Sequence, residues 1–282
     1  MVQLQTIRGW HIHHKERLLY RTTSGSPFII LKFFHYPNYN QDVQIRKFPD
    51  RCKVKTKEYN SFFLFNQKLR RKGIISLERT IDVIPTISFD NLSDNWGKIS
   101  SYSTAIQQKY QESSKFWPLQ SSKFQDIAQQ DWFKTNDLSN WMQLAHRFIS
   151  MRINHKQNQS ERLGAYQVLQ TGIGDCDEFT DLFITLARIR GIPCRRLTGY
   201  YIFLKNIKAE PHAWSEILSP NGRWITVDLA LNNLGNHTVN YVTLKIEEFN
   251  PALPDFHIQT KHVSKVHYQW DQPAPIVTPI YR

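Results

Sequence analysis

Hydrophobic and polar positions follow two different periods along the chain, and the change near residue 101 predicts two kinds of structure. Before it, β-favouring runs broken by proline or asparagine cover 28–34, 43–48, 53–57, 61–65 and 74–87. After it, apolar residues recur at helical spacing over 121–130, 137–153, 161–170 and 176–190. Further β-rich runs follow at 194–204, 212–219, 223–230 and 240–246. The pattern predicts an α+β chain, with a β-sandwich in residues 1–110 and a mixed domain of helices and strands in residues 111–282.

The tail after Asn250 has a pattern of its own. It holds prolines at positions 251, 254, 273, 275 and 279, which do not fit the interior of a helix. We expect this tail to be extended and to wrap back on the body of the protein.

One predicted helix begins at a cysteine. Asp175 and Glu178 have the spacing of a capping box, which makes Cys176 the first helical residue. Free backbone N–H groups and the positive end of the helix dipole favour a thiolate there. The carboxylates of Asp175, Asp177, Glu178 and Asp181 oppose it, so we expect activation to depend on a paired imidazolium. Apolar residues at helical spacing predict one buried face of this helix, made by Phe179, Leu182, Phe183 and Leu186.

Two β-rich runs after this helix predict a hairpin. They span 212–218 and 223–229 and are joined by Ser-Pro-Asn-Gly, a sequence typical of turns. If the numbers of facing residues add to 440, His212 lies opposite Asp228; if they add to 442, the two are diagonal neighbours on one face. An odd register separates them. In either even register, the face with His212 and Asp228 is polar and aromatic, whereas the other face is apolar and better suited to the core.

These motifs resemble the transglutaminase-like superfamily, specifically over residues 161–230 and more loosely back to about residue 115. The resemblance implies a papain-like α/β core, with Cys176 as nucleophile, His212 as general base and acid, and Asp228 as the group that orients the imidazole. A β-sandwich ahead of this core is a familiar arrangement in microbial members. The motifs that carry the resemblance are Gly174 to Phe179, Gly191 to Pro193, Leu197 to Tyr200, His212 to Trp214 and Trp224 to Asp228.

Cysteine, histidine and aspartate together can catalyse acyl transfer through a thioester. The superfamily includes protein cross-linkers, cysteine peptidases, peptide N-glycanases and inactive members, so the resemblance leaves the substrate open. We predict a hydrolase of protein or peptide amide bonds, because no feature predicts the water-excluding tunnel or calcium switch of a cross-linker. The alternatives are a glutamine amine transferase and a non-catalytic scaffold.

Other candidate residues stay open or have a structural explanation. The backbone N–H of Cys176 is the obvious oxyanion donor, and a second could come from Gln167, Gln170 or Trp141. Cys52 and Cys194 are predicted to pack in the core. Trp214 and Trp224 suit a substrate groove and the core about equally well. The histidines near both ends show no ligand spacing, and no phosphate loop or EF-hand is present, so we predict no cofactor and no metal.

Charge is concentrated in the N-terminal part of the chain. Residues 1–110 hold 18 Lys and Arg against 8 Asp and Glu, which is net +10 of the total +12. The basic run of Lys68, Arg70, Arg71 and Lys72 allows a second hypothesis, binding to nucleic acid or to an acidic surface. A short basic run is more often a solvated loop, so we do not favour nucleic acid as a partner, and a basic groove could equally recruit an acidic protein substrate to Cys176.

The chain shows no sign of export or of membrane insertion. The first thirty residues lack a signal-peptide pattern, and no apolar stretch reaches the roughly 18 residues of a membrane helix. Three cysteines in 282 residues suit a reducing compartment. We therefore expect a cytoplasmic protein with no membrane contact.

Overall fold

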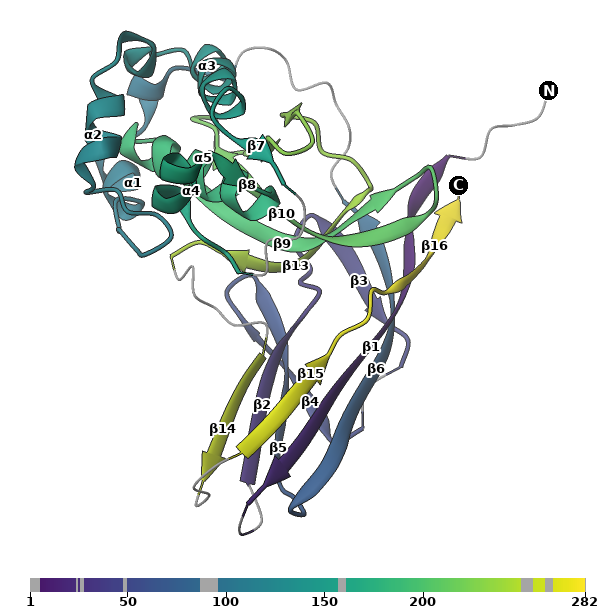
Figure 1. Ribbon diagram of the computed structural model, residues 1–282. Coiled ribbons are helices and arrows are strands. Elements are labelled where there is room, and N and C mark those ends of the chain that lie inside the picture. The colour runs from purple at the N-terminus through teal and green to yellow at the C-terminus, as the bar shows by residue number, and fades with distance from the viewer. Residues whose placement is uncertain are drawn as a thin grey trace, which may run out of the picture.

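Two antiparallel sheets form the strand-rich part of the protein (Figure 1). The computed structural model describes residues 6–23, 25, 28–47, 50–86, 96–156, 161–249, 256–261 and 266–281. The first sheet contains β1 (Ile7–Thr22), β3 (Gln41–Ile45), β6 (Lys72–Pro85), β15 (Val266–Asp271) and β16 (Ile276–Tyr281). The second contains β2 (Phe28–His35), β4 (Cys52–Lys57), β5 (Asn60–Lys68) and β14 (Phe256–Lys261).

Apolar side chains from both sheets meet in one core, which makes this part a β-sandwich. Leu18 and Leu77 come from the first sheet, and Leu31 and Phe63 come from the second; all four are at most 1% exposed. The β-sandwich predicted from the N-terminal pattern is therefore confirmed.

Strand β1 is the element of the sandwich that the hydrophobic pattern did not predict. It is 16 residues long, and alternate side chains point inward along it. Two of the inward positions hold His14 and Glu16, which break the apolar alternation of the sequence. Both are fully or almost fully buried, because Arg79 of β6 forms an ion pair with Glu16 and a hydrogen bond with His14. These two polar residues hide the strand in the sequence pattern, and only the partner on the neighbouring strand makes their burial possible.

The C-terminal tail returns to the sandwich, as its extended pattern suggested. β14 pairs with β2, while β15 and β16 pair with the two halves of β1. Ile7 faces Tyr281 in this pairing, so the described ends of the chain lie side by side (Figure 1). The domain boundary at residue 110 remains a prediction, and the structure adds that residues 256–281 contribute strands to the N-terminal sheets.

Helices form the second part and surround α5 (Cys176–Ile189). The others are α1 (Thr104–Lys109), α2 (Ser122–Ala128), α3 (Leu138–Ser150) and α4 (Ala165–Thr171), with short 3₁₀ turns at Ile99–Ser101 and Asp131–Lys134. The four predicted helices are present with shorter bounds. Their common core includes Trp117, Phe124, Trp141 and Phe183, all fully buried. Among the described residues, no helix has the length and apolarity that a membrane crossing needs.

A five-stranded antiparallel sheet connects the helices with the sandwich. Its order is β12 (Asn233–Leu234), β11 (Trp224–Asp228), β10 (Lys208–Leu218), β9 (Cys194–Phe203) and β13 (Tyr241–Glu247). The β9–β10 hairpin runs from beneath the helices across the top of the sandwich (Figure 1). At that end, Tyr200 and Ile202 of β9 share a buried cluster with Trp10, Ile12 and Ile81.

Two side-chain amides of the sandwich bind the outer strand of this sheet. Gln41 donates to the carbonyl of Thr243 at 2.8 Å and accepts from its N–H at 3.1 Å. Asn60 does the same at Ile246, at 2.9 and 2.8 Å. Each amide reproduces the pairing of a neighbouring strand, so the backbone N–H and carbonyl of Thr243 and of Ile246 are satisfied without a further strand.

Replacing Gln41 by glutamate tests this contact. Gln41→Glu loses the donor to Thr243 and places a carboxylate at a buried position, so we expect the free energy of unfolding to fall by about 1–3 kcal/mol. The matched control is Gln44→Glu on the same strand, where the side chain is exposed and the change stays within about 0.5 kcal/mol. Urea denaturation of both variants measures the difference, and equal stability of the two would contradict the assignment.

Candidate active site

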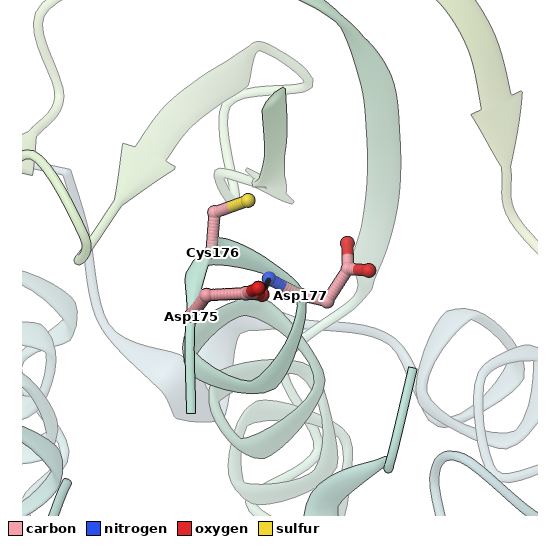
Figure 2. Close-up of side chains that lie close together, drawn as sticks. All are labelled: Asp175, Cys176 and Asp177. Carbon is pink, nitrogen blue, oxygen red and sulfur yellow. Dashed lines mark hydrogen bonds between the residues drawn. The ribbon is translucent and has the colours of Figure 1, made fainter. Parts of the chain in front are cut away.

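The nucleophile candidate lies at the start of α5. The Asp175 side chain accepts a hydrogen bond from the Asp177 N–H, and the Glu178 side chain accepts one from the Asp175 N–H. The predicted capping box is therefore confirmed. Cys176 is the first helical residue and is partly exposed. Figure 2 shows its sulfur pointing out of the first turn, away from the body of the helix. The apolar stripe predicted for this helix is buried, with Leu182, Phe183 and Leu186 fully inaccessible.

The imidazole and its carboxylate partner come from the β10–β11 hairpin. Ser215 pairs with Val227 and Glu216 with Thr226, so the register is the even one in which facing numbers add to 442. His212 and Asp228 are therefore diagonal neighbours on one face, as one of the two even registers predicted. The opposite face carries Ile217 and the apolar side chains of β11 into the helical core.

Asp228 holds the imidazole through a fully satisfied carboxylate. Its Oδ2 atom lies 2.7 Å from His212 Nε2 and also accepts from the Tyr241 hydroxyl at 2.9 Å. Its Oδ1 atom accepts from the backbone N–H of Leu231 at 3.2 Å. The Asp228 side chain is only 1% exposed, so these contacts fix its orientation in a dry environment where charge interactions are strong.

Cys176 is the second group that acts on the His212 imidazole. Because Nε2 is engaged by Asp228, Nδ1 is the ring nitrogen that remains for Cys176, whose side chain acts on the imidazole. Burial opposes a charged imidazole, but the hydrogen bonds to Asp228 and Cys176 and the negative charges of both groups outweigh it. Together they raise the pKa of His212 to about 10. The site therefore favours an imidazolium held between a carboxylate and a sulfur.

Two aromatic side chains support this imidazole. The ring of Trp214 is nearly parallel to it, at 18° with centroids 6.2 Å apart, and Tyr201 meets it edge-on at 5.9 Å. Trp214 is completely buried, so it belongs to the core beneath the site and not to an open groove. Trp224 likewise serves packing, because the guanidinium of Arg195 covers its ring at 3.6 Å.

Carboxylates crowd the sulfur. The ligand atoms of Asp175, Cys176 and Asp177 lie within 4.8 Å of one another, a density that could hold a cation. However, Asp175 accepts the Asp177 N–H in the helix cap, and Asp177 is paired with Arg196. Because both carboxylates already have partners inside the protein, we assign no metal to this turn.

The structure places the remaining candidate residues from the sequence in different environments. Trp141 is fully buried between Phe133 and Phe183, and its Nε1 has no hydrogen-bond partner among the described residues, so its role as an oxyanion donor stays a prediction. Gln167 and Gln170 are exposed on α4 and stay open as oxyanion donors. The other two cysteines are both buried and free: Cys52 in the sandwich and Cys194 at the start of β9.

Tyr241 is the contact that the sequence analysis missed. It lies on β13, outside the hairpin, and reaches Asp228 because β13 pairs with β9 so that Tyr241 faces Tyr201. Asn233 donates to its hydroxyl at 3.0 Å and supports it from the other side. Neither residue lies in a motif of its own, and only the pairing of distant strands brings them to the site.

Comparisons with known proteins agree with the fold. Residues 125–229 match the model of the transglutaminase-like superfamily. A proposed cysteine protease from Cytophaga hutchinsonii superposes with a TM-score of 0.59 at 16% identity, over 99% of this chain and 96% of that chain. The periplasmic domain of TgpA from Pseudomonas aeruginosa gives a TM-score of 0.39 at 12% identity, over 77% and 87%. No curated protein matches the sequence.

The matched region extends from α2 through α5 to the end of the β10–β11 hairpin, and it contains all three residues of the candidate site. The Cytophaga hutchinsonii structure is similar over the whole chain, so the similarity includes the β-sandwich as well as the mixed core. Residues 125–229 therefore form a transglutaminase-like domain.

Proposed function

We propose that the protein is a thiol-dependent hydrolase that cleaves amide bonds of proteins or peptides. The observation that carries this proposal is the chain of contacts from a partly exposed thiol to a histidine and on to a buried carboxylate. Cys176 serves as nucleophile, His212 as general acid and base, and Asp228 as the group that orients the imidazole.

Each residue has one step in the reaction. The Cys176 thiolate attacks the carbonyl carbon, and the tetrahedral intermediate collapses as the carbon–nitrogen bond breaks. The His212 imidazolium gives its proton to the leaving amine. His212 then takes a proton from water as the water attacks the thioester, which releases the acid and regenerates the thiolate with its imidazolium partner.

Charge on the carbonyl oxygen needs hydrogen-bond donors. The Cys176 backbone N–H is at the first position of α5, where a helical N–H has no partner inside the helix. It belongs to the same residue as the attacking sulfur, so it would stabilise the oxyanion as the sulfur attacks.

Exposure of the thiol favours water as the acceptor over a second protein amine. Cys176 is partly open to solvent, and an exposed thioester hydrolyses unless water is kept away from it. The name of the Cytophaga hutchinsonii neighbour points to the same reaction class. The net positive charge of residues 1–110 supports an acidic polypeptide as the substrate.

The first prediction concerns the reactivity of Cys176. An ordinary thiol, with a pKa near 8.5, is only about one percent thiolate at pH 6.5. We expect iodoacetamide to modify Cys176 at this pH at least about tenfold faster than an ordinary thiol, and His212→Ala to remove the advantage. Mass spectrometry at each cysteine measures both rates.

Cys52 and Cys194 are internal controls in the same sample. Burial raises the pKa of their thiols to about 11 and about 12, so neither reacts at pH 6.5. Slow modification of Cys176 alongside a fast reaction with a small neutral thiol reagent would contradict the proposal. Hydrolysis itself is tested by cleavage of an acidic protein substrate that disappears in Cys176→Ala. Incorporation of a labelled primary amine would instead favour the transferase.

The second prediction concerns the proton on His212. Its imidazole should titrate near pH 10 in histidine-labelled NMR spectra, with His212→Gln used to assign the signal. Asp228→Asn removes the partner charge, so the midpoint should fall toward the ordinary value of about 6.5. A wild-type midpoint near 6.5 would exclude the ion pair.

The same shift predicts how stability depends on pH. The folded pKa of His212 lies above the unfolded one, so the stabilisation is complete below about pH 6.5 and disappears as the pH rises through about 10. The difference in unfolding free energy between wild type and Asp228→Asn should therefore be larger at pH 6 than at pH 10.5. Urea denaturation at the two pH values measures it, and a difference that does not depend on pH would contradict this coupling.

A further inference from the structure

Asp177 follows the nucleophile directly in the sequence. Its carboxylate lies within 4.8 Å of the Cys176 sulfur, as does that of Asp175. A negative charge at this distance disfavours a thiolate. Asp175 is committed to the helix cap, so the charge that needs a separate counterion is that of Asp177.

Arg196 supplies this counterion. It lies on β9 with its side chain only 4% exposed, and it donates to Asp177 Oδ1 through Nη2. Its other nitrogens lie 3.1 Å from Glu247 and 3.7 Å from Asp181. Figure 2 shows the Asp177 carboxylate projecting from the first turn of the helix on a different side from the sulfur.

Two further cations hold the acidic neighbours of Arg196. Arg162 pairs with Asp181 at 2.6 Å and with Glu247 at 3.1 Å, and Lys245 lies 3.4 Å from Glu247. Asp181 and Glu247 thus have counterions of their own. Burial disfavours the charged form of the Asp177 carboxylate. The positive charges of Arg196, Arg162 and Lys245 favour it more strongly, so the pKa of Asp177 lies below its ordinary value.

The pair also fixes distance. Asp177 belongs to the first turn of α5, and Arg196 belongs to β9, whose neighbour β10 carries His212. The ion pair therefore ties the turn that bears the nucleophile to the sheet that bears the imidazole. Thr180 makes a second link, from its hydroxyl to the Ala213 carbonyl at 3.2 Å, but that link carries no charge.

We propose that Arg196, acting through Asp177, is a positioning residue that keeps the Cys176–His212 pair charged and in contact. The inference rests on the proposed function of Cys176 as a nucleophile. Without Arg196, the Asp177 carboxylate is a free negative charge beside the sulfur and competes for the imidazolium.

The groups around the sulfur define the electrostatic balance. His212 faces it from β10, with Asp228 of β11 behind the imidazole, and Asp175 and Asp177 face it from its own turn. Glu178 is fully buried in the capping box, and burial raises its pKa to about 7. The test therefore compares two single variants with the double variant, and Glu178 is unchanged in all of them.

A double-mutant cycle tests the proposal. Arg196→Met leaves Asp177 unpaired, and the pH of half-maximal alkylation at Cys176 should rise by about one unit. Asp177→Asn removes the negative charge and keeps the shape, so the midpoint should fall. The double variant, Asp177→Asn with Arg196→Met, should return most of the way to the wild-type midpoint. Alkylation rates from pH 4 to 10 by mass spectrometry give all four values.

Arg195→Met is the matched control. Arg195 is the preceding residue on the same strand and is equally buried, but it pairs with Glu216 at 2.8 Å on the other face of the sheet. Its loss should leave the midpoint unchanged even if stability falls. Circular dichroism of each variant verifies that it is folded, and Asp177→Asn, at a partly exposed side chain, carries the test if Arg196→Met does not fold.

The outcomes separate the two proposals. A wild-type Cys176 that reacts no faster than an ordinary thiol overturns the proposed function. A reactive wild type whose midpoint moves equally, or not at all, in Arg196→Met and Asp177→Asn overturns the role of Arg196 alone. Loss of rate at every pH without a shift in either direction would indicate a structural role only, and would likewise overturn it.

Discussion

Pairing between β10 and β11 places His212 and Asp228 on one face of the sheet, and a slip of one residue would put them on opposite faces. Two features hold the register. The turn is closed by Ser219, whose N–H donates to the Arg223 carbonyl and whose own carbonyl accepts from Gly222. The apolar face of the hairpin then enters the helical core. A slip would expose this apolar face, so burial that serves stability also keeps the histidine and its carboxylate together.

Charge around the nucleophile is balanced by partners that come from other elements. The first turn of α5 holds a cysteine among acidic residues, which by itself opposes a thiolate. The structure compensates with His212 on one side and with Arg196 on the other. Both lie on the same sheet, so the packing of α5 on β9 and β10 decides the distance between nucleophile and base as well as the local charge. Removing any one charge would leave another without its partner, which is costly at buried positions.

The sandwich and the core are joined by specific contacts as well as by apolar packing. Gln41 and Asn60 bind the backbone of β13, and β13 carries Tyr241, which donates to Asp228. Tyr200 of β9 reaches His14 in the sandwich at 3.2 Å. The N-terminal strands thus support the sheet on which the candidate site is built. The tail from residue 256 onward completes both sandwich sheets, so strands from both ends of the chain stabilise that support.

The sequence by itself determined what depends on neighbouring residues. The capping box, the helix that begins at Cys176, the hairpin turn and the alternation of its faces are local, and each follows from spacing. Strand β1 was hidden because His14 and Glu16 occupy inward positions, and their compatibility with burial depends on Arg79, about 65 residues away. Tertiary structure likewise decided three further features. These are which of the two even registers forms, the hydrogen bond from Tyr241 to Asp228, and the pairing of Arg196 with Asp177. They depend on packing between elements distant in sequence, and local spacing carries no information about such contacts.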